Sequence, residues 1–153
     1  GVVEVDKARF VVADIPGLIE GASEGAGIGT RFLGHIERCG VLFHLIDGTQ
    51  DDVVGAYRTI RGELEAYGAD LEGKTEIVVM NKIDAMSDQD RQLKRTLLQD
   101  ACGSKVFELS GVTRDGLWPL LHAGYEAVKK QRYKNLVEDK TEEEIAEAQA
   151  WTP

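Results

Sequence analysis

The stretch IVVMNKID, residues 77–84, decides the fold of this chain. Four apolar residues followed by N-K-x-D are typical of a strand that ends in a base-recognition loop, at the carboxyl edge of a parallel sheet where α/β folds bind nucleotides. A carboxylate at Asp84, held in the plane of a base, would accept both the ring N–H and the exocyclic amine of guanine, a pair of donors that adenine lacks. The alternative is a strand followed by a polar turn, with Asp84 as a helix cap.

The N-K-x-D loop supplies the first candidate binding residues. Asp84 would select the base, and Asn81 would hold the loop and reach the other edge of the base. Lys82 would lay its methylene stem over the sugar and ring. With Ile83 between Lys82 and Asp84, all four residues are candidates for nucleotide binding.

A second strand-then-loop signal lies upstream, where the apolar residues 10–13 run into Asp14-Ile15-Pro16-Gly17. An Asp at a strand end, three residues before Gly, is where phosphate-binding sites keep a magnesium-side carboxylate and an amide that senses the γ-phosphate. Gly17 has no side chain, so its N–H can approach a phosphate oxygen closely. These four residues are candidates for the phosphate side of the site, with Asp14 acting on Mg²⁺ through water.

The third signal is the apolar strand at residues 106–109, which leads into Ser110-Gly111-Val112. A backbone N–H in this tight turn would meet the carbonyl oxygen of guanine. Each signal alone also occurs in ordinary turns, but their order along the chain predicts a GTPase-type G domain. The predicted fold class is α/β of the P-loop NTPase type, a mostly parallel sheet flanked by helices, with GTP or GDP and Mg²⁺ as ligands.

The segment ADIPGLIEGASEGAGIGTRFLGHIERC, residues 13–39, resembles switch II and the following helix of the Obg family of ribosome-associated GTPases almost residue for residue. HLIDGT (residues 44–49), NKID and SGVT continue the resemblance, which covers roughly residues 1–130. It implies GTP binding, slow hydrolysis to GDP and magnesium dependence. It also implies action in large ribosomal subunit assembly and growth control, with the ribosome and its RNA as partners. The globular composition and the two cysteines, Cys39 and Cys102, predict a cytoplasmic location.

No catalytic residue can be assigned in this chain. Leu18 follows D-x-x-G, where many GTPases place a water-orienting Gln, and its side chain can neither donate nor accept a hydrogen bond. Slow hydrolysis without a partner is therefore expected.

We expect no phosphate cradle of the P-loop type in this chain. GADLEGKT, residues 68–75, has the spacing G-x-x-x-x-G-K-[ST], but it precedes the strand predicted at residues 77–80 instead of following a strand and opening a helix. By the resemblance, the chain begins just after switch I, so we expect a fragment that lacks the first strand and P-loop and is inactive alone. The missing strand would lie between residues 10–13 and 41–46, leaving open strand edges. In an ordered fragment we expect this slot to be filled by rearrangement, by self-association through strand exchange with another copy, or by an upstream segment. The competing function is a non-catalytic pseudo-GTPase module that binds a partner through switch II.

Hydrophobic spacing predicts the other elements. An antiparallel hairpin is expected over residues 1–5 and 10–13, with a turn at Asp6-Lys7. Helices are expected over 28–38, 53–67 and 117–128, and a buried strand over 41–46. Ser87 with Asp90 starts a further helix, whose predicted apolar face consists of Leu93, Leu97, Leu98 and Ala101.

The net charge of −9 is concentrated near the C-terminus, where residues 138–147 hold six acidic side chains and one lysine. A basic cluster precedes it and is interpreted as the cationic end of a helix, with RNA phosphates as the alternative partner; its members are Lys129, Lys130, Arg132 and Lys134.

We predict a partial G domain in residues 1–131 and a charged, acidic tail in residues 132–153. Within the tail, Thr141-x-x-Glu144 has the form of a capping box and predicts a short helix. No apolar run approaches the length of a membrane span.

Overall fold

The computed structural model describes residues 1–15, 34–68 and 70–150. Pro16, Gly17, Leu18 and most of the switch II segment lie outside the described residues, and so does most of the helix predicted at 28–38. In chain order the elements are β1 (Val2–Val5), β2 (Ala8–Val11), β3 (Val41–Asp47), α2 (Val53–Tyr67), η1 (Leu71–Gly73), β4 (Thr75–Asn81), η2 (Ile83–Ala85), α3 (Asp88–Cys102), β5 (Phe107–Leu109) and α4 (Leu117–Ala150).

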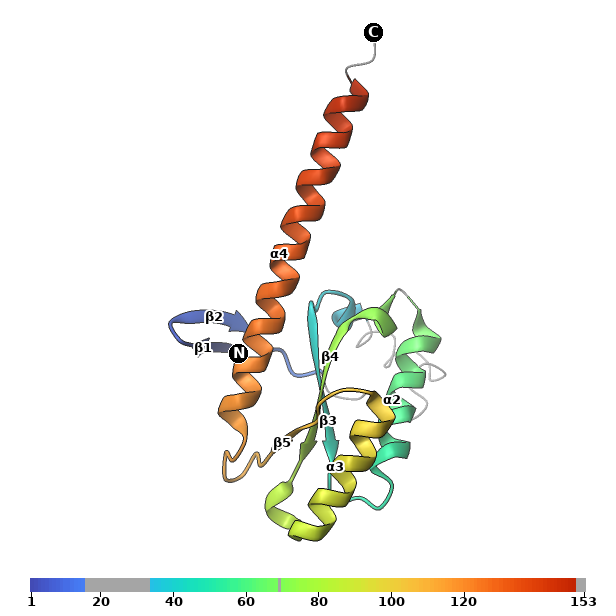
Figure 1. Cartoon of the computed structure of the whole chain (residues 1–153), viewed down its shortest axis with the longest axis vertical. Helices are drawn as coiled ribbons and strands as arrows, with labels where there is room; N and C mark the ends of the chain where they lie inside the picture. Colours follow the sequence, from blue (N-terminus) through green and yellow to red (C-terminus); the bar gives the residue numbers. More distant parts are fainter. Residues whose placement is uncertain (16–33, 69, 151–153) are drawn as a thin grey trace.

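Strands β3, β4 and β5 form a parallel sheet with β4 in the centre. The register pairs Asp47 of β3 with Asn81 of β4, and Asn81 with Leu109 of β5. The carboxyl ends of all three strands therefore finish side by side. Figure 1 shows α2 and α3 on one side of this sheet and α4 on the other, which is the α/β arrangement that the sequence predicts.

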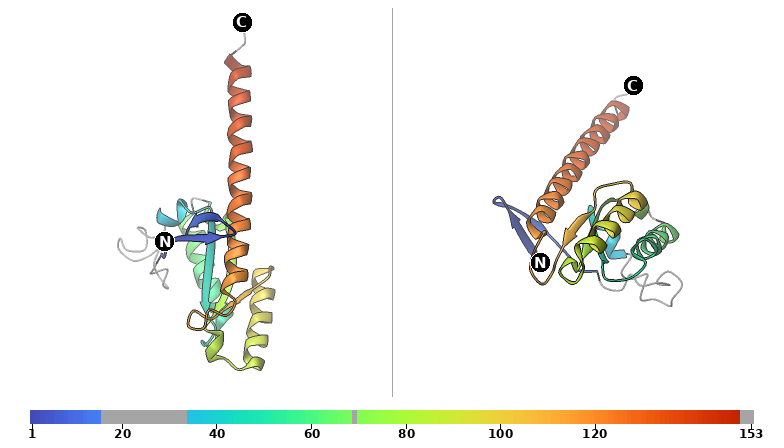
Figure 2. Two further views of the ribbon diagram at one scale, coloured as in Figure 1. Left: turned by 90° about the vertical axis from the view of Figure 1, so that its left-hand side faces the viewer. Right: turned by 60° about the horizontal axis from the view of Figure 1, so that its bottom comes forward.

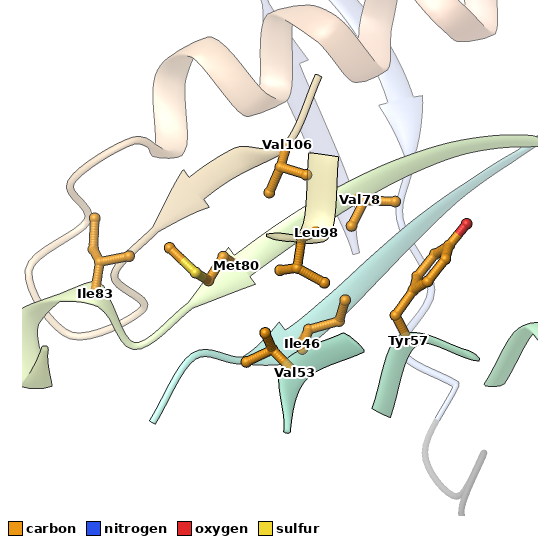
Figure 3. Packing of buried hydrophobic residues seen from close by; sticks show 8 residues of the cluster. All are labelled: Ile46, Val53, Tyr57, Val78, Met80, Ile83, Leu98 and Val106. Carbon is orange, nitrogen blue, oxygen red and sulfur yellow. The ribbon is translucent and has the colours of Figure 1, made fainter. Parts of the chain in front are cut away.

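The main hydrophobic core lies between the sheet and helices α2 and α3 (Figure 3). Ile46 of β3, Val78 and Met80 of β4, and Tyr57 of α2 surround Leu98 of α3, which is completely buried. This cluster fixes the two helices against the strands whose ends carry the predicted binding loops.

The opposite face of the sheet packs against α4. Val79 of β4 and Leu109 of β5 form a smaller cluster with Leu120 of α4. Gly124 allows the helix to approach closely, because a Cβ there would overlap the ring of Phe43 in β3. Strand β4 is thus covered on both faces, which explains why its sequence is a continuous apolar run rather than an alternating one.

Strands β1 and β2 form a separate antiparallel hairpin, as predicted around Asp6 and Lys7. Both turn residues have positive φ, 47° and 66°, which suits the twist of a two-residue hairpin loop. His122 Nε2 of α4 lies 3.2 Å from Asp6 Oδ2, so α4 contacts the hairpin as well as the sheet. Among the described residues, no strand joins this hairpin to the sheet of β3, β4 and β5.

Two apolar patterns are less buried than predicted. Leu45 of β3 is 51% exposed, because β3 has a strand neighbour on only one side in the described part of the chain. On α3, the predicted core residue Leu98 is buried, but the predicted core residues Leu93 and Leu97 are exposed, and Lys94 is buried instead. The spacing of leucines alone does not predict which side of α3 faces the core, because a lysine whose ammonium group finds acceptors can also occupy a buried position.

Helix α4 corrects the prediction for the C-terminal region. It runs without interruption to Ala150, so the basic cluster lies within the helix and not at its C-terminus. Thr141 does not begin a new helix, and its hydroxyl donates to the carbonyl of Val137 at 2.8 Å. Figure 2 shows the second half of α4 extending away from the rest of the molecule. None of the described helices is both long and apolar enough to cross a membrane.

Candidate functional site

The loops after β4 and β5 meet at the carboxyl edge of the sheet. Ser110 Oγ donates to Asp84 Oδ1 at 2.6 Å, and the Gly111 N–H donates to Asn81 Oδ1 at 3.3 Å. The structure therefore brings together the N-K-x-D and S-G-V loops, which are almost thirty residues apart in sequence. Parallel pairing causes this, since it aligns Asn81 with Leu109 and places the residues that follow them next to each other.

Ser110 is completely buried and holds the Asp84 carboxylate in place. Its hydroxyl also accepts the N–H of Thr113 at 3.0 Å, so one side chain fixes both loops. Within the described part of the chain, Asp84 Oδ2 has no hydrogen-bond partner, and Asp84 itself is solvent-accessible. The carboxylate is oriented yet free to accept a pair of donors from a ligand.

The backbone amides of the S-G-V turn are almost all in use. The N–H groups of residues 110, 111, 113, 114 and 115 donate to acceptors within the loop or to Asn81. Among these described residues, only the Val112 N–H lacks an acceptor, and Val112 is 84% exposed. This amide is therefore a free donor in the turn for which the sequence predicts a contact with a base carbonyl.

Lys82 lies at the entrance of the site and is oriented by Asp47. Its φ of 64° is left-handed, and its Nζ donates to Asp47 Oδ2 at 2.6 Å. Thr49 donates to Asp47 Oδ1 through both its N–H, at 2.9 Å, and its hydroxyl, at 2.6 Å. The hydrogen bonds from Lys82 and Thr49 lower the pKa of Asp47 to about 2, so this carboxylate is ionised at neutral pH.

Asp47 lies beside the site, in contact with Lys82, and the sequence motifs did not assign a role to it. The signal for it was present, because Asp47 ends an apolar strand and precedes Gly48 in the quoted segment HLIDGT. Gly48 is buried beneath this corner, and its N–H donates to the carbonyl of Asn81 at 2.9 Å. A Cβ at Gly48 would overlap Met86 Sδ, which explains glycine at this position.

Lys94 of α3 anchors the same loop from below. Its buried ammonium donates to the carbonyls of Gly48 and Gln50, both at 2.9 Å, and lies 3.2 Å from Asp90 Oδ2. The loop after β3 is therefore fixed by a cation from another element. This contact keeps Asp47 in reach of Lys82.

A hollow of about 190 Å³ between α3 and β5 contains a group of paired charges; its lining residues are Asp88, Arg91, Gln92, Arg95 and Glu108. Glu108 of β5 accepts from Arg91 at 2.6 Å and from Arg95 at 2.8 Å. Burial opposes ionisation of Glu108, yet the two arginine hydrogen bonds outweigh it and lower the pKa of this carboxyl group. These ion pairs tie α3 to β5 and use the charges of both arginines and of Glu108.

The predicted phosphate side is only partly described. Asp14 is exposed, and Ile15 packs against the cluster of Ile36, Leu64 and Leu71. No group of three or more metal-binding side chains occurs among the described residues. A single exposed carboxylate suits Mg²⁺ only in the mode where nucleotide phosphates and water complete the coordination shell.

Comparisons with known proteins agree with this geometry. Residues 1–82, more than half of the chain, match the family model of the 50S ribosome-binding GTPases. The fold is similar to that of a nucleolar GTP-binding protein 1 from Plasmodium falciparum, with a TM-score of 0.64 and 18% sequence identity. The alignment covers 96% of this chain and 78% of that one, which shows a G-domain-like α/β fold. This chain belongs to the family of 50S ribosome-binding GTPases.

Proposed function

We propose that this chain is the guanine-recognising part of an Obg-type GTPase. One observation carries the proposal: Asp84, Asn81, Ser110 and Gly111 form a network of hydrogen bonds in which, among the described residues, Asp84 Oδ2 and the Val112 N–H have no partner. Guanine presents two donors and a carbonyl oxygen on adjoining positions of one edge. An oriented carboxylate and a backbone amide match that pattern, whereas adenine would leave the carboxylate unpaired.

The remaining residues of the loops support binding without selecting the base. The stem of Lys82 covers the sugar and ring while Asp47 holds its ammonium group. Ile83 is buried in the core and supports the loop from within. Ser110, Gly111 and Val112 form the second wall of the base site.

On the phosphate side, we assign Asp14, Ile15, Pro16 and Gly17 to the nucleotide phosphates, with Asp14 contacting Mg²⁺ through water. The ion, when bound with the phosphates, would neutralise charge that develops during GTP hydrolysis. This chain's part is to hold the base and to present the Asp14 carboxylate. The string at residues 68–75 that has P-loop spacing leads into strand β4, and its Lys74 donates to the carbonyls of Glu37 and Cys39, so we assign no phosphate to it. Residues 1–131 form the G-domain part of this proposal, and residues 132–153 the charged extension.

The cellular role follows from the family and the resemblance. The family name and the Obg-like switch II segment support action on the large ribosomal subunit in the cytoplasm, with slow hydrolysis of GTP to GDP. Binding of purified large subunits to the parent protein, with GTP against GDP, tests this role. Equal recovery with both nucleotides would contradict a GTP-dependent ribosomal function.

Base selection is tested on the 153-residue chain by NMR titration with GDP and ADP, following the amide of Val112. We expect weak binding of GDP, roughly millimolar, and no measurable shift of this signal with ADP. Asp84→Asn should abolish the preference for guanine and favour xanthine nucleotides, which carry a carbonyl where guanine has its amine. Asp88→Asn, an exposed carboxylate at the start of α3, is the matched control and should behave as wild type. Equal response to GDP and ADP in the wild type would overturn the proposal.

A further inference from the structure

The outer half of α4 is a helix without cover. Residues 132–147 are all exposed, which makes sixteen consecutive exposed positions. Figures 1 and 2 show this part of α4 extending beyond the other elements in every view. A helix of this length is marginal in water unless an apolar face packs against a partner.

This outer half carries such a face. Tyr133 is 71% exposed, Leu136 60% and Val137 46%. By the 3.6-residue repeat they lie on the side of the helix opposite Leu120 and Gly124, which contact the sheet. A partner on this face would not collide with the body of the molecule.

The charges on either side of Leu136 and Val137 have opposite signs. Toward the N-terminal side lie Lys129, Lys130, Arg132 and Lys134. Toward the C-terminal side lie Glu138, Asp139, Glu142, Glu143, Glu144 and Glu147, with Lys140 among them. A segment whose two halves are oppositely charged is complementary to a reversed copy of itself.

We propose that the outer half of α4 is a self-association surface on which two copies of this chain pack antiparallel. The two-fold axis passes between Leu136 and Val137, so that each contacts the other across the interface, as an isologous contact requires. This register places Lys129 opposite Glu144 of the second copy and Lys130 opposite Glu143. It also places Tyr133 opposite Lys140, a pairing that suits a cation–π contact.

Ion pairs within the described part of a single helix leave some of these charged side chains unpaired. Lys129 lies 3.8 Å from Glu126, and Lys134 lies 3.7 Å from Glu138, both pairs more than half exposed and therefore weak. Among the described residues, Lys130, Glu143 and Glu144 form no ion pair. Parallel packing is disfavoured because it would align like charges. The contact is a few helical turns long, which predicts a weak, reversible dimer rather than a permanent one.

Sedimentation velocity of the 153-residue chain tests the proposal. We expect the weight-average sedimentation coefficient to rise from the monomer to the dimer value between about 10 µM and 1 mM chain, as is typical of small interfaces. Association should weaken several-fold when the salt concentration is raised from about 0.05 to 0.5 M, because the charge pairs are exposed. A wild-type chain that remains monomeric throughout would overturn the proposal.

Charge reversal separates this arrangement from every other mode of self-association. Lys129→Glu/Lys130→Glu and Glu143→Lys/Glu144→Lys should each be monomeric, since like charges then face each other in both halves of the homodimer. An equimolar mixture of the two variants should dimerise again, because each restores the pairs of the other. Arg58→Glu, an exposed reversal on α2, should dimerise as wild type. Circular dichroism should show the helix content of every variant unchanged.

The results of these experiments distinguish antiparallel packing of α4 from other modes of self-association. Association through the open edge of β3 would leave both reversal variants dimeric and would refute the proposal. If both variants are monomeric but their mixture is monomeric too, antiparallel pairing in this register is also refuted. Neither outcome depends on nucleotide binding, so the proposed function is tested separately.

Discussion

Replacing Lys94 with Met tests whether the buried ammonium of α3 holds the loop beside the base site. Lys94 is only 9% exposed, and Met keeps most of its apolar stem. The substitution removes the donor to the carbonyls of Gly48 and Gln50 and the contact with Asp90. The substitution therefore measures how much the ammonium group of Lys94 contributes to the free energy of unfolding.

The magnitude depends on which of these groups can return to water. Gln50 is exposed, so water can hydrate its carbonyl, and losing the hydrogen bond from Lys94 to this carbonyl costs little free energy. Gly48 is buried, and leaving its carbonyl without a donor costs about 1–3 kcal/mol. The pair with the half-exposed Asp90 adds less than about 1 kcal/mol. Met saves part of the cost of burying a charge, so we expect a net destabilisation of about 2 kcal/mol.

Urea unfolding followed by circular dichroism measures this change. Leu93→Ala on the neighbouring position is the discriminating control, because the sequence pattern predicts a core residue there and the structure exposes 57% of it. We expect Leu93→Ala to cost no more than about 0.5 kcal/mol and Leu98→Ala, which is completely buried, to cost about 2–5 kcal/mol. If Leu93→Ala lowers the free energy of unfolding more than Lys94→Met does, the observed orientation of α3, with Lys94 buried and Leu93 exposed, is refuted.

Three further predictions concern stability. Gly116→Ala should destabilise by more than 1 kcal/mol, roughly, because the residue has φ 77° and a Cβ there would overlap the Glu108 carbonyl; thermal unfolding measures it, and a neutral effect would contradict the turn geometry. Gly62→Ala in α2, where a Cβ meets nothing within 4 Å, should stabilise by about 0.5–1 kcal/mol in the same assay. The pKa of Asp47 is lowered from 3.8 to about 2, so its contribution is present above pH 4 and is lost as the pH falls toward 2. Asp47→Asn should flatten the urea-unfolding stability profile in that window, and an unchanged slope would show that Lys82 and Thr49 do not hold the carboxylate.

Local patterns in the sequence predicted much of the fold. The turn at Asp6-Lys7, the apolar run of β4 and the Ser87 cap of α3 each depend on residues within a few positions of one another. The pairing of the N-K-x-D and S-G-V loops could also be anticipated, because parallel strands bring their carboxyl ends to one edge of a sheet. These are consequences of periodicity and of chain direction.

Contacts between distant segments could not be predicted in this way. The partners of Lys82 and Lys94 lie 35 and 46 positions away, on the loop after β3. The free amide of Val112 becomes apparent only when every other donor of its turn has been assigned an acceptor. Each of these facts depends on how whole elements are placed around the sheet, and a sequence pattern describes only one element at a time.

The sequence by itself determined the chemistry at the ends of the strands: a carboxylate at Asp84, an amide at Asn81 and a small tight turn at Ser110-Gly111. Only the tertiary structure decided how these groups are oriented, since Ser110 reaches Asp84 across two strands that are remote in sequence. It also decided that α4 continues past the body, carrying its charges and apolar face into solvent. The physical reason is the same in both cases: residue type sets what a group can bind, but packing between elements sets which groups meet and which remain free.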